Sequence, residues 1–227
     1  MTDALSTALG QDAPPENAGS PDSPSRDTPK SLRTRARILD CAARLLVEIG
    51  YAAATNARIA EAADLTRGAM LYHFPTRETL VEALVDHLQA ARTALLAQAS
   101  DQAPPGADLA EHAIDAYWSL LRQPSFVAFT ELEAVGRTDP VVRAALSRAQ
   151  AEFDQAQSGL QFSRMLQAGS GPRFQASRDL ARFMLEGLAR ASLTYDGGAR
   201  VERLLAVIKR ATRMLNRKGG EHDLWPE

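Results

Sequence analysis

Apolar side chains recur every three or four positions along most of the chain, which is the spacing of one buried face of an α-helix. Gly50 follows the first of these stripes at the point where a helix C-cap is expected. Alanine is abundant, whereas the clusters of Val, Ile and Thr that are typical of strands are scarce. We therefore predict an all-α fold. The first stripe consists of Ile38, Ala42, Leu45, Leu46 and Ile49.

Three further helices are predicted to follow in quick succession. Thr55 is a favourable N-cap for a helix that ends at the break over 64–66. Thr66 can cap a third helix that reaches about Phe74, and a longer fourth helix is expected over 76–100. A short helix, a tight turn and a second short helix together form the pattern of a helix-turn-helix motif.

The rest of the chain is predicted to be helical, with loops at 103–106 and 169–172. The expected helices span about 108–122, 124–137, 140–166, 176–195 and 199–217. Residues 1–30 are rich in Pro, Ser and Asp, so we predict a disordered tail, with a regulatory or partner-binding arm as the alternative. The expected domains are this tail, an N-terminal helix-turn-helix domain over 31–78, a helical domain over 79–218 and a short tail over 219–227.

The helix predicted to begin after Thr66 has the composition expected of a DNA-reading helix. Arg67 lies near its N-terminus, where free backbone N–H groups favour phosphate, and an arginine can also read guanine in the major groove. Gly68 and Ala69 add little bulk, which allows a close approach to base edges, and Tyr72 offers a hydroxyl group. This composition predicts a helix that enters a DNA groove.

The distribution of charge supports this interpretation locally. Residues 30–77 hold eight Lys and Arg but four Asp and Glu, so their net charge is +4. The whole chain has a net charge of −2, and the residues outside this region therefore carry about −6. A local basic excess is the electrostatic pattern expected of a DNA-binding module.

Three segments of this region resemble the TetR/AcrR family of transcriptional regulators. They are RARILDCA over 35–42, IAEAA over 59–63 and GAMLYHFPTRETL over 68–80. The resemblance covers roughly residues 33–84. It implies a three-helix DNA-binding domain followed by a helical domain that dimerises and often binds a small molecule.

The chain departs from the common family pattern at three positions. Asp64 replaces the glycine of the turn, although Asp tolerates the positive φ that such a turn needs. Leu71 stands where a tyrosine is common, and the neighbouring Tyr72 is expected to supply that phosphate contact. Arg77 replaces the usual lysine at the start of the fourth helix and retains a charge for a phosphate.

We predict DNA contacts from the motif and from the helix before it. Alternatives stay open for several of them, namely helix capping by Thr55 and Thr66, a solvated surface charge at Arg58 and a packed ring at His73. The predicted contacts are Arg33, Arg35, Thr55, Arg58, Thr66, Arg67, Gly68, Ala69, Tyr72, His73 and Arg77.

Bulky side chains among many alanines in the second half of the chain are candidates for an effector pocket between helices. An ordinary core is the alternative for each of them, and a solvated helix face is the alternative for the carboxylate. The candidates are His112, Tyr117, Trp118, Phe126, Phe129, Glu133, Phe153, Phe162, Met165, Phe183 and Met184.

The last two predicted helices carry apolar stripes and can pair with a second copy in a four-helix bundle, so a homodimer is expected. Cys41 is the sole cysteine, and its position on an apolar face predicts a buried thiol in a reducing, cytoplasmic protein. We expect no metal, no cofactor, no membrane segment and no enzymatic activity, because no ligand cluster, long apolar run or catalytic constellation is present. The predicted function is a ligand-released repressor that binds a near-palindromic operator. A helical protein-interaction regulator is the alternative.

Overall fold

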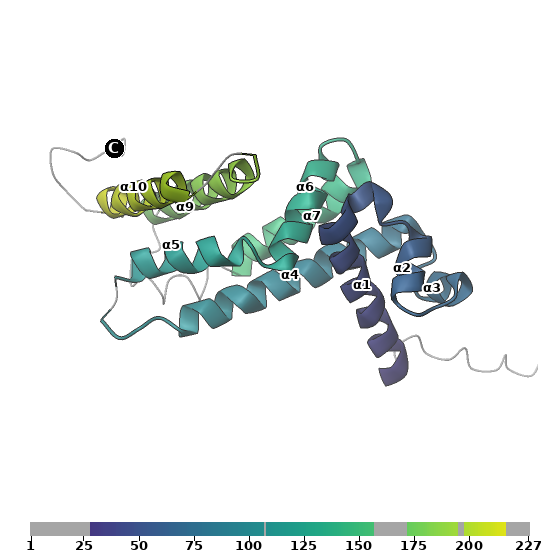
Figure 1. The fold of residues 1–227 in the computed structure, drawn as a ribbon. Helices are drawn as coiled ribbons and strands as arrows, with labels where there is room; N and C mark the ends of the chain where they lie inside the picture. The colour runs from purple at the N-terminus through teal and green to yellow at the C-terminus, as the bar shows by residue number, and fades with distance from the viewer. Residues whose placement is uncertain (1–27, 107, 157–171, 195–197, 217–227) are drawn as a thin grey trace, which may run out of the picture.

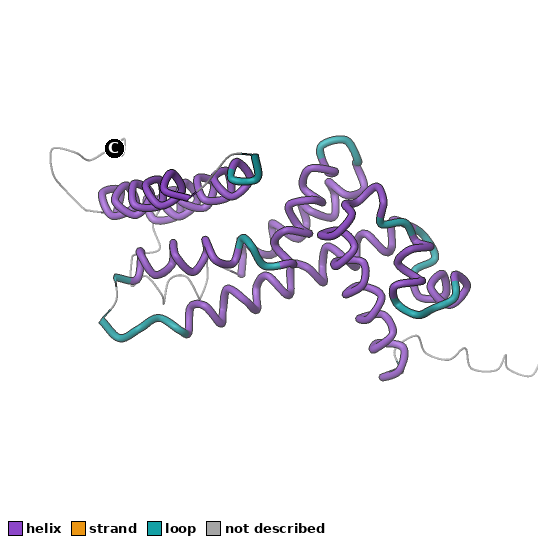
Figure 2. The backbone as a smooth tube through the Cα atoms, in the orientation of Figure 1, coloured by secondary structure: helices purple, strands orange, loops and turns teal. Residues whose placement is uncertain are grey.

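The structure, a computed structural model, describes residues 28–106, 108–156, 172–194 and 198–216. These residues form helices and connecting loops, without a strand among them, and the predicted all-α fold is confirmed (Figure 2). The helices are α1 (Pro29–Ala53), α2 (Asn56–Ala62), α3 (Arg67–His73), α4 (Arg77–Asp101), α5 (Leu109–Leu120), α6 (Pro124–Gly136), α7 (Pro140–Ala156), α9 (Pro172–Ala191) and α10 (Gly198–Asn216). The predicted tail over 219–227 and most of the predicted tail over 1–30 and of the predicted loop at 169–172 lie outside the described residues. Pro29 and Lys30, predicted to belong to the tail, begin α1 instead, because a proline is favoured in the first turn of a helix; Pro172, predicted in the loop, begins α9.

The long helix α4 connects the two ends of the molecule. Figure 1 shows α1, α2 and α3 gathered at one end of α4, and α9 and α10 beyond α5 at the other. Helices α6 and α7 pack along α4 and also reach the first end, where α6 contacts α1. The three N-terminal helices, hereafter the DNA head (28–76), are thus attached to the other helices through α4 and α6.

The first helix begins and bends where the sequence favours it. The Thr28 hydroxyl accepts a hydrogen bond from Ser31 N at 3.2 Å, and Pro29 occupies the first turn, where its missing N–H costs nothing. Gly50 has φ +76° and interrupts α1 as predicted, although one more helical turn follows before Ala54. Ile49, expected on the buried stripe, is 40% exposed.

Threonines cap the two short helices of the motif. Thr55 accepts from Arg58 N at 3.4 Å at the start of α2, and Thr66 accepts from Ala69 N at 3.1 Å at the start of α3. Asp64, in the turn between them, has φ +52°. The left-handed conformation predicted for this aspartate is therefore confirmed.

Two hydrophobic clusters hold the helices together. The first joins the DNA head to α4, α6 and α7, and its most buried side chains include Ile38, Ile59, Phe74 and Leu132. The second joins the far half of α4 to α5, α9, α10 and the start of α6. Because the first cluster continues from the head into α4, α6 and α7, the domain boundary expected near residue 78 is not a break in the core.

The later helices follow the prediction with one shift. Helix α9 begins at Pro172 rather than near residue 176, because a proline is favoured in the first turn of a helix. It ends at Ala191, before the predicted end near residue 195. Helix α7 is described as far as Ala156, and the predicted continuation to residue 166 lies outside the described residues.

Candidate DNA-binding and effector sites

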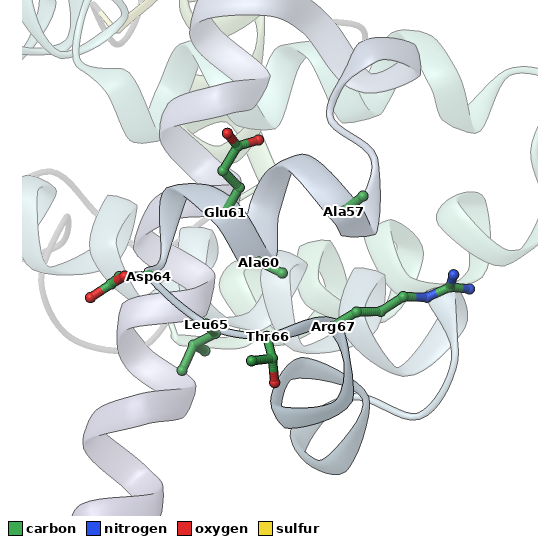
Figure 3. Close-up of a pocket in the computed structure, with 7 residues that line it drawn as sticks. All are labelled: Ala57, Ala60, Glu61, Asp64, Leu65, Thr66 and Arg67. Atoms are coloured by element: carbon green, nitrogen blue, oxygen red, sulfur yellow. The ribbon is translucent and has the colours of Figure 1, made fainter.

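Helix α3 presents a polar face outward from the DNA head. Thr66, Arg67 and Gly68 are exposed, and the Tyr72 side chain is 51% exposed. Met70 and Phe74 lie on the opposite face and are fully buried. In Figure 3 the Arg67 side chain extends away from both α2 and α3. The buried pair therefore anchors the helix and leaves the residues of its first turn accessible to a ligand.

A groove of about 490 Å³ lies between α2 and the start of α3. It contains two carboxylates as well as the base of Arg67, so its walls do not form a uniform anion site (Figure 3). The residues that line it are Ala57, Ala60, Glu61, Asp64, Leu65, Thr66 and Arg67. A phosphate is therefore expected to contact the rim at Arg67 rather than the floor of the groove.

Two arginines predicted to contact DNA are instead turned toward the protein. Arg35 donates from Nη1 to the His73 carbonyl at 2.7 Å, and its guanidinium lies 4.3 Å from the Phe74 ring centroid. Arg77 donates from Nη1 to the Ala54 carbonyl at 2.9 Å. Each side chain satisfies carbonyl groups at the end of a helix, a role that a sequence pattern alone does not separate from phosphate binding.

The remaining basic candidates of the head lie on its surface. Arg33 is exposed and donates from Nε to the Pro29 carbonyl one turn back, at 3.3 Å. It is part of α1, so it does not belong to an extended arm. Arg58 is also exposed, and its Nη1 lies 3.5 Å from the Ala53 carbonyl. Both arginines remain exposed despite these hydrogen bonds.

His73 is partly buried at the end of α3. Its ring lies edge-on to Tyr72, with 5.2 Å between ring centroids. Burial lowers the pKa of His73 below its usual value, and the nearby positive charge of Arg35 lowers it further. Near neutral pH this imidazole is therefore a neutral hydrogen-bonding group rather than a cation for a phosphate.

A buried polar cluster lies between α4, α5, α6 and α9. Arg92 is 5% exposed, and its guanidinium lies 3.8 Å from the centroid of Phe129 and 4.9 Å from that of Phe126. Arg92 Nη1 donates to Gln89 Oε1 at 3.1 Å. Within the described residues, the buried Nε2 of Gln89 has no hydrogen-bond acceptor. We name Gln89, Arg92, Tyr117, Glu133 and Glu186 the polar cluster.

Nearby acidic groups partly offset the free-energy cost of burying the charged Arg92 side chain. The Tyr117 hydroxyl donates to Glu186 Oε1 at 2.7 Å, and burial together with this carboxylate raises the pKa of Tyr117 far above its usual value. Partial burial and the charge of Glu186 raise the pKa of Glu133. Burial lowers the pKa of Arg92, while Tyr117, Glu133 and Glu186 act in the opposite direction. Uncompensated burial of charge is costly, so this cluster is unusual for a simple core.

Only part of the predicted effector set meets at the polar cluster, namely Tyr117, Phe126, Phe129 and Glu133. Trp118 and Met184 pack in or against the second hydrophobic cluster, and the Arg122 guanidinium stacks 4.9 Å from the Trp118 ring. The side chain of Phe153, and all of Phe162 and Met165, lie outside the described residues.

Two of the predicted effector residues lie away from the polar cluster. Phe183 is 57% exposed, because it occupies the outer face of α9. His112 lines a separate groove of about 410 Å³ between α4 and α5, where its Nε2 lies 3.1 Å from the Ala99 carbonyl.

Sequence reasoning missed Gln89, Arg92 and Glu186. A signal for Arg92 was present, because it lies four residues after the buried Leu88 and four before the buried Leu96, on the inward stripe of α4. A charge on an apolar stripe can mark a buried site. Glu186 had no comparable signal, since its contact with Tyr117 joins residues that are distant in sequence.

The described residues also bear on the expectations for metal ligands, membrane-spanning helices and the single cysteine. No group of three or more His, Cys, Asp or Glu side chains among them is arranged to hold a metal ion. None of the described helices is both long and apolar enough to cross a membrane. Cys41 is buried as predicted, and its thiol donates to the Ala62 carbonyl at 3.2 Å.

Comparison with known proteins identifies the DNA head. A family model described as "Bacterial regulatory proteins, tetR family" matches residues 38–84. The HTH-type transcriptional regulator TtgR of Pseudomonas putida is 43% identical over 63 residues, which are 28% of this chain and 30% of TtgR. YvkB of Bacillus subtilis, an uncharacterised HTH-type transcriptional regulator, is 40% identical over 65 residues, 29% of this chain and 34% of YvkB. The match thus spans about a third of each of these relatives.

Solved structures extend the similarity of fold to most of the chain. Salmonella enterica GusR has a TM-score of 0.56 and 18% identity, covering 85% of this chain and 99% of GusR. The multidrug binding protein EbrR, complexed with imidazole, has a TM-score of 0.55 and 20% identity, covering 83% of this chain and 98% of EbrR. TtgR and YvkB are named as transcriptional regulators, and EbrR is named as a multidrug binding protein. The DNA head thus contains a segment that matches the tetR family of bacterial regulatory proteins, and the chain shares its fold with the solved structures named here.

Proposed function

We propose that the protein is a DNA-binding transcriptional regulator that acts as a homodimeric repressor and is released from its operator by a small molecule. The observation that carries the proposal is the outward face of α3, where Arg67 and Tyr72 are exposed above the buried Met70 and Phe74. A helix whose opposite face is packed against the core in this way can enter the major groove with its exposed side chains. Such a regulator would act in the cytoplasm, where bacterial DNA lies.

We propose DNA contacts at exposed and half-buried residues of the head. Arg67, Gly68, Ala69 and Tyr72 would face the bases or the adjoining backbone, and the exposed Thr66 would add its hydroxyl. At the edges of this surface, Thr55, Arg58 and Arg33 would contact phosphate. His73 would donate a hydrogen bond from its neutral imidazole. Arg35 and Arg77 leave the list of proposed contacts, because carbonyl groups of the protein already hold their guanidinium groups.

Unpaired apolar side chains on α9 and α10 support the proposed dimer. They recur at helical spacing on the outer side of the two helices, where Gly187 is also exposed and a Cβ added to it would meet no other atom within 4 Å. These residues, which we name the outer apolar face, are Leu180, Phe183, Leu204, Val207 and Met214. Pairing this face with that of a second copy would form a four-helix bundle and cover it from water.

The polar cluster is the proposed effector site. It combines aromatic faces, a buried cation, carboxylates and an unsatisfied amide donor, which are the groups that orient a small molecule in an apolar pocket. EbrR, whose structures contain imidazole or proflavin, shows that a protein of this fold can hold such compounds. An effector would release the operator by binding more tightly to a conformation whose two heads do not match the DNA.

Selection of bound sequences from random duplexes tests the proposed function. The full-length protein is expected to enrich a near-palindromic sequence whose half-site centres lie about 34 Å apart, or a multiple of that distance. Binding of arbitrary duplex should weaken steeply with salt, because phosphate contacts release counterions. Failure to enrich any sequence, together with a flat salt dependence, would favour the alternative of a protein-interaction regulator.

A titration with proflavin gives a first test of the effector site. Proflavin is a planar aromatic cation, so its fluorescence should change saturably if it stacks near Phe126 and Phe129 beside the two carboxylates. The matched variants Glu133→Gln and Glu48→Gln each remove one negative charge, but Glu48 lies on the exposed side of α1. Weaker binding in the first variant alone would support this site, whereas equal binding in both would argue against it.

A further inference from the structure

The segment that runs from the last turn of α1, after Gly50, to the start of α2 is held from two sides by residues outside the DNA head. We propose that Glu131 of α6 and Arg77 of α4 are positioning residues for DNA binding, which clamp this segment at Tyr51 and thereby fix the orientation of α2 and α3. The inference rests on the proposed function and identifies the contacts through which the effector domain would control the head. We call Arg77, Glu131 and Tyr51 the clamp.

Glu131 holds the first side of the clamp. Its Oε1 accepts a hydrogen bond from Tyr51 N at 3.1 Å, across 80 positions of sequence. The bond forms directly after Gly50, whose φ of +76° interrupts the helix. A Cβ at Gly50 would also lie 3.2 Å from Glu131 Oε1, so a larger residue would both strain the backbone and crowd the carboxylate. The bend in α1 and the position of α6 are therefore matched to one another.

Arg77 holds the second side. Its guanidinium lies 4.6 Å from the Tyr51 ring centroid, and Nη2 lies 3.5 Å from the Tyr51 carbonyl. Nη1 donates to the Ala54 carbonyl at 2.9 Å and to Asn56 Oδ1 at 3.3 Å. Asn56 begins α2 and Arg77 begins α4, so one side chain joins the starts of both helices to the end of α1.

Both helices that supply the clamp also supply the polar cluster. In α6, Glu131 lies two residues after Phe129, a separation of about 3 Å along the helix axis. In α4, Arg77 lies fifteen residues before Arg92, or about 22 Å along the axis. The Arg92 guanidinium rests on the Phe129 ring at 3.8 Å, so α4 and α6 contact one another at the proposed effector site as well as through Tyr51.

This arrangement gives a small movement of α6 a direct route to the head. If an effector separates Phe129 from Arg92, α6 shifts relative to α4, and Glu131 and Arg77 can no longer hold Tyr51 at the same time. The start of α2 would then lose its fixed orientation, and with it α3. The physical requirement is a contact with two arrangements that both sites influence, and the clamp identifies the atoms of one of them.

Substitutions at Glu131 provide the principal test, because two replacements of similar length form a matched pair. Glu131→Gln removes the charge but keeps an oxygen acceptor for Tyr51 N, whereas Glu131→Met has nearly the same length, no charge and no acceptor. Both residues are good helix formers. In full-length protein we expect Glu131→Met to weaken binding of the selected operator roughly three- to tenfold and Glu131→Gln to bind like the wild type. Equal affinity of the two variants would overturn the role of Glu131.

Substitutions at Arg77 distinguish positioning from phosphate contact. Arg77→Met should weaken operator binding to a similar degree, while the salt dependence of binding to arbitrary duplex stays unchanged. A direct phosphate contact would instead reduce the slope of log affinity against log salt by about 0.9 when the charge is removed. That reduction would overturn the assignment of Arg77 to the clamp. Arg77→Lys keeps the charge but not the several contacts, and should weaken operator binding nearly as much as Arg77→Met.

Hydrogen exchange of the free protein separates the clamp from the proposed function. Glu131→Met should speed exchange of the Tyr51 amide and of the α2 amides, while Glu131→Gln and the core of α4 keep wild-type rates. If no operator can be selected but this pattern is seen, the clamp stands and the proposed function fails. If an operator is selected but the Tyr51 and α2 amides exchange alike in both variants, the clamp fails and the proposed function stands.

Discussion

The DNA head and the helices beyond it distribute polar and apolar side chains in opposite ways. The head buries apolar groups such as Ile38, Ile59 and Phe74, and its exposed charges face water. The four buried polar or charged residues in the described part of the chain, Gln89, Arg92, Ser177 and Thr212, all lie in α4, α9 and α10. The same part of the molecule leaves the outer apolar face uncovered.

The difference separates an apolar core from a region that buries polar groups. The first hydrophobic cluster, which the head shares with α4, α6 and α7, gains stability from the burial of apolar side chains. A buried cation and an exposed apolar face both cost free energy in an isolated chain, and they are retained where binding offsets that cost. This contrast supports the proposal that the head recognises DNA and that the other helices bind the effector and dimerise.

The largest expected effect concerns the apolar core of the head. Phe74→Ala would leave a cavity where the side chain is now fully buried, and would also remove the ring on which Arg35 stacks. We expect a loss of about 3–5 kcal/mol in the free energy of unfolding, measured by urea denaturation. Tyr72→Ala, two residues away and 51% exposed, is the matched control and should change stability by less than about 0.5 kcal/mol. Similar losses in both variants would contradict the assigned faces of α3.

The head could be predicted from sequence because its determinants are local. Thr55 and Thr66 are N-caps whose bonds span three residues, and Met70 with Phe74 marks a buried face one turn long. Even the positive φ of Asp64 follows from the need for a tight turn between two short helices. Local rules of this kind need no knowledge of the rest of the fold.

The second expected effect concerns the outer apolar face. Val207→Glu would place two symmetry-related carboxylates in the proposed four-helix bundle, without partners for either. We expect dimerisation to weaken by about 3 kcal/mol, or on the order of 100-fold, in sedimentation experiments. Ala206→Glu adds the same charge about 100° further round the helix and should leave the dimer intact. If Val207→Glu dimerises like the wild type, the apolar face has another role.

The surroundings that sequence reasoning could not predict depend on contacts between distant elements. Arg77 is expected at a phosphate from its place in the motif, but its position relative to Ala54 and Tyr51 is set by how α4 packs against α1. Phe183 and Tyr117 are both expected in one pocket, although α9 turns the first outward and the second bonds to Glu186. A helical pattern defines which residues share a face of one helix, but not which neighbour that face meets.

The third prediction concerns the outward face of α3 and has a smaller effect. Arg67→Ala should weaken operator binding by about 1–3 kcal/mol, because one good base contact contributes that much. Stability should change little, since Arg67 is exposed and caps no helix. Gel-shift titrations at several salt concentrations distinguish the possible contacts. A base contact leaves the salt slope unchanged and relaxes specificity, whereas a phosphate contact reduces the slope by about 0.9. Unchanged affinity would remove Arg67 from the proposed interface.

The smallest expected effect concerns the turn of the motif and tests how closely the head follows local rules. Asp64 adopts φ +52°, a conformation that costs an L-residue free energy but costs glycine almost nothing. Asp64→Gly should therefore raise the stability by about 0.5–1 kcal/mol, and Asp64→Ala should lower it by about 1 kcal/mol. Asp64→Asn is the control for charge, because asparagine tolerates the same φ; it should unfold like the wild type in thermal denaturation. If Asp64→Gly were less stable than Asp64→Asn, side-chain contacts rather than backbone conformation would determine the residue at this turn.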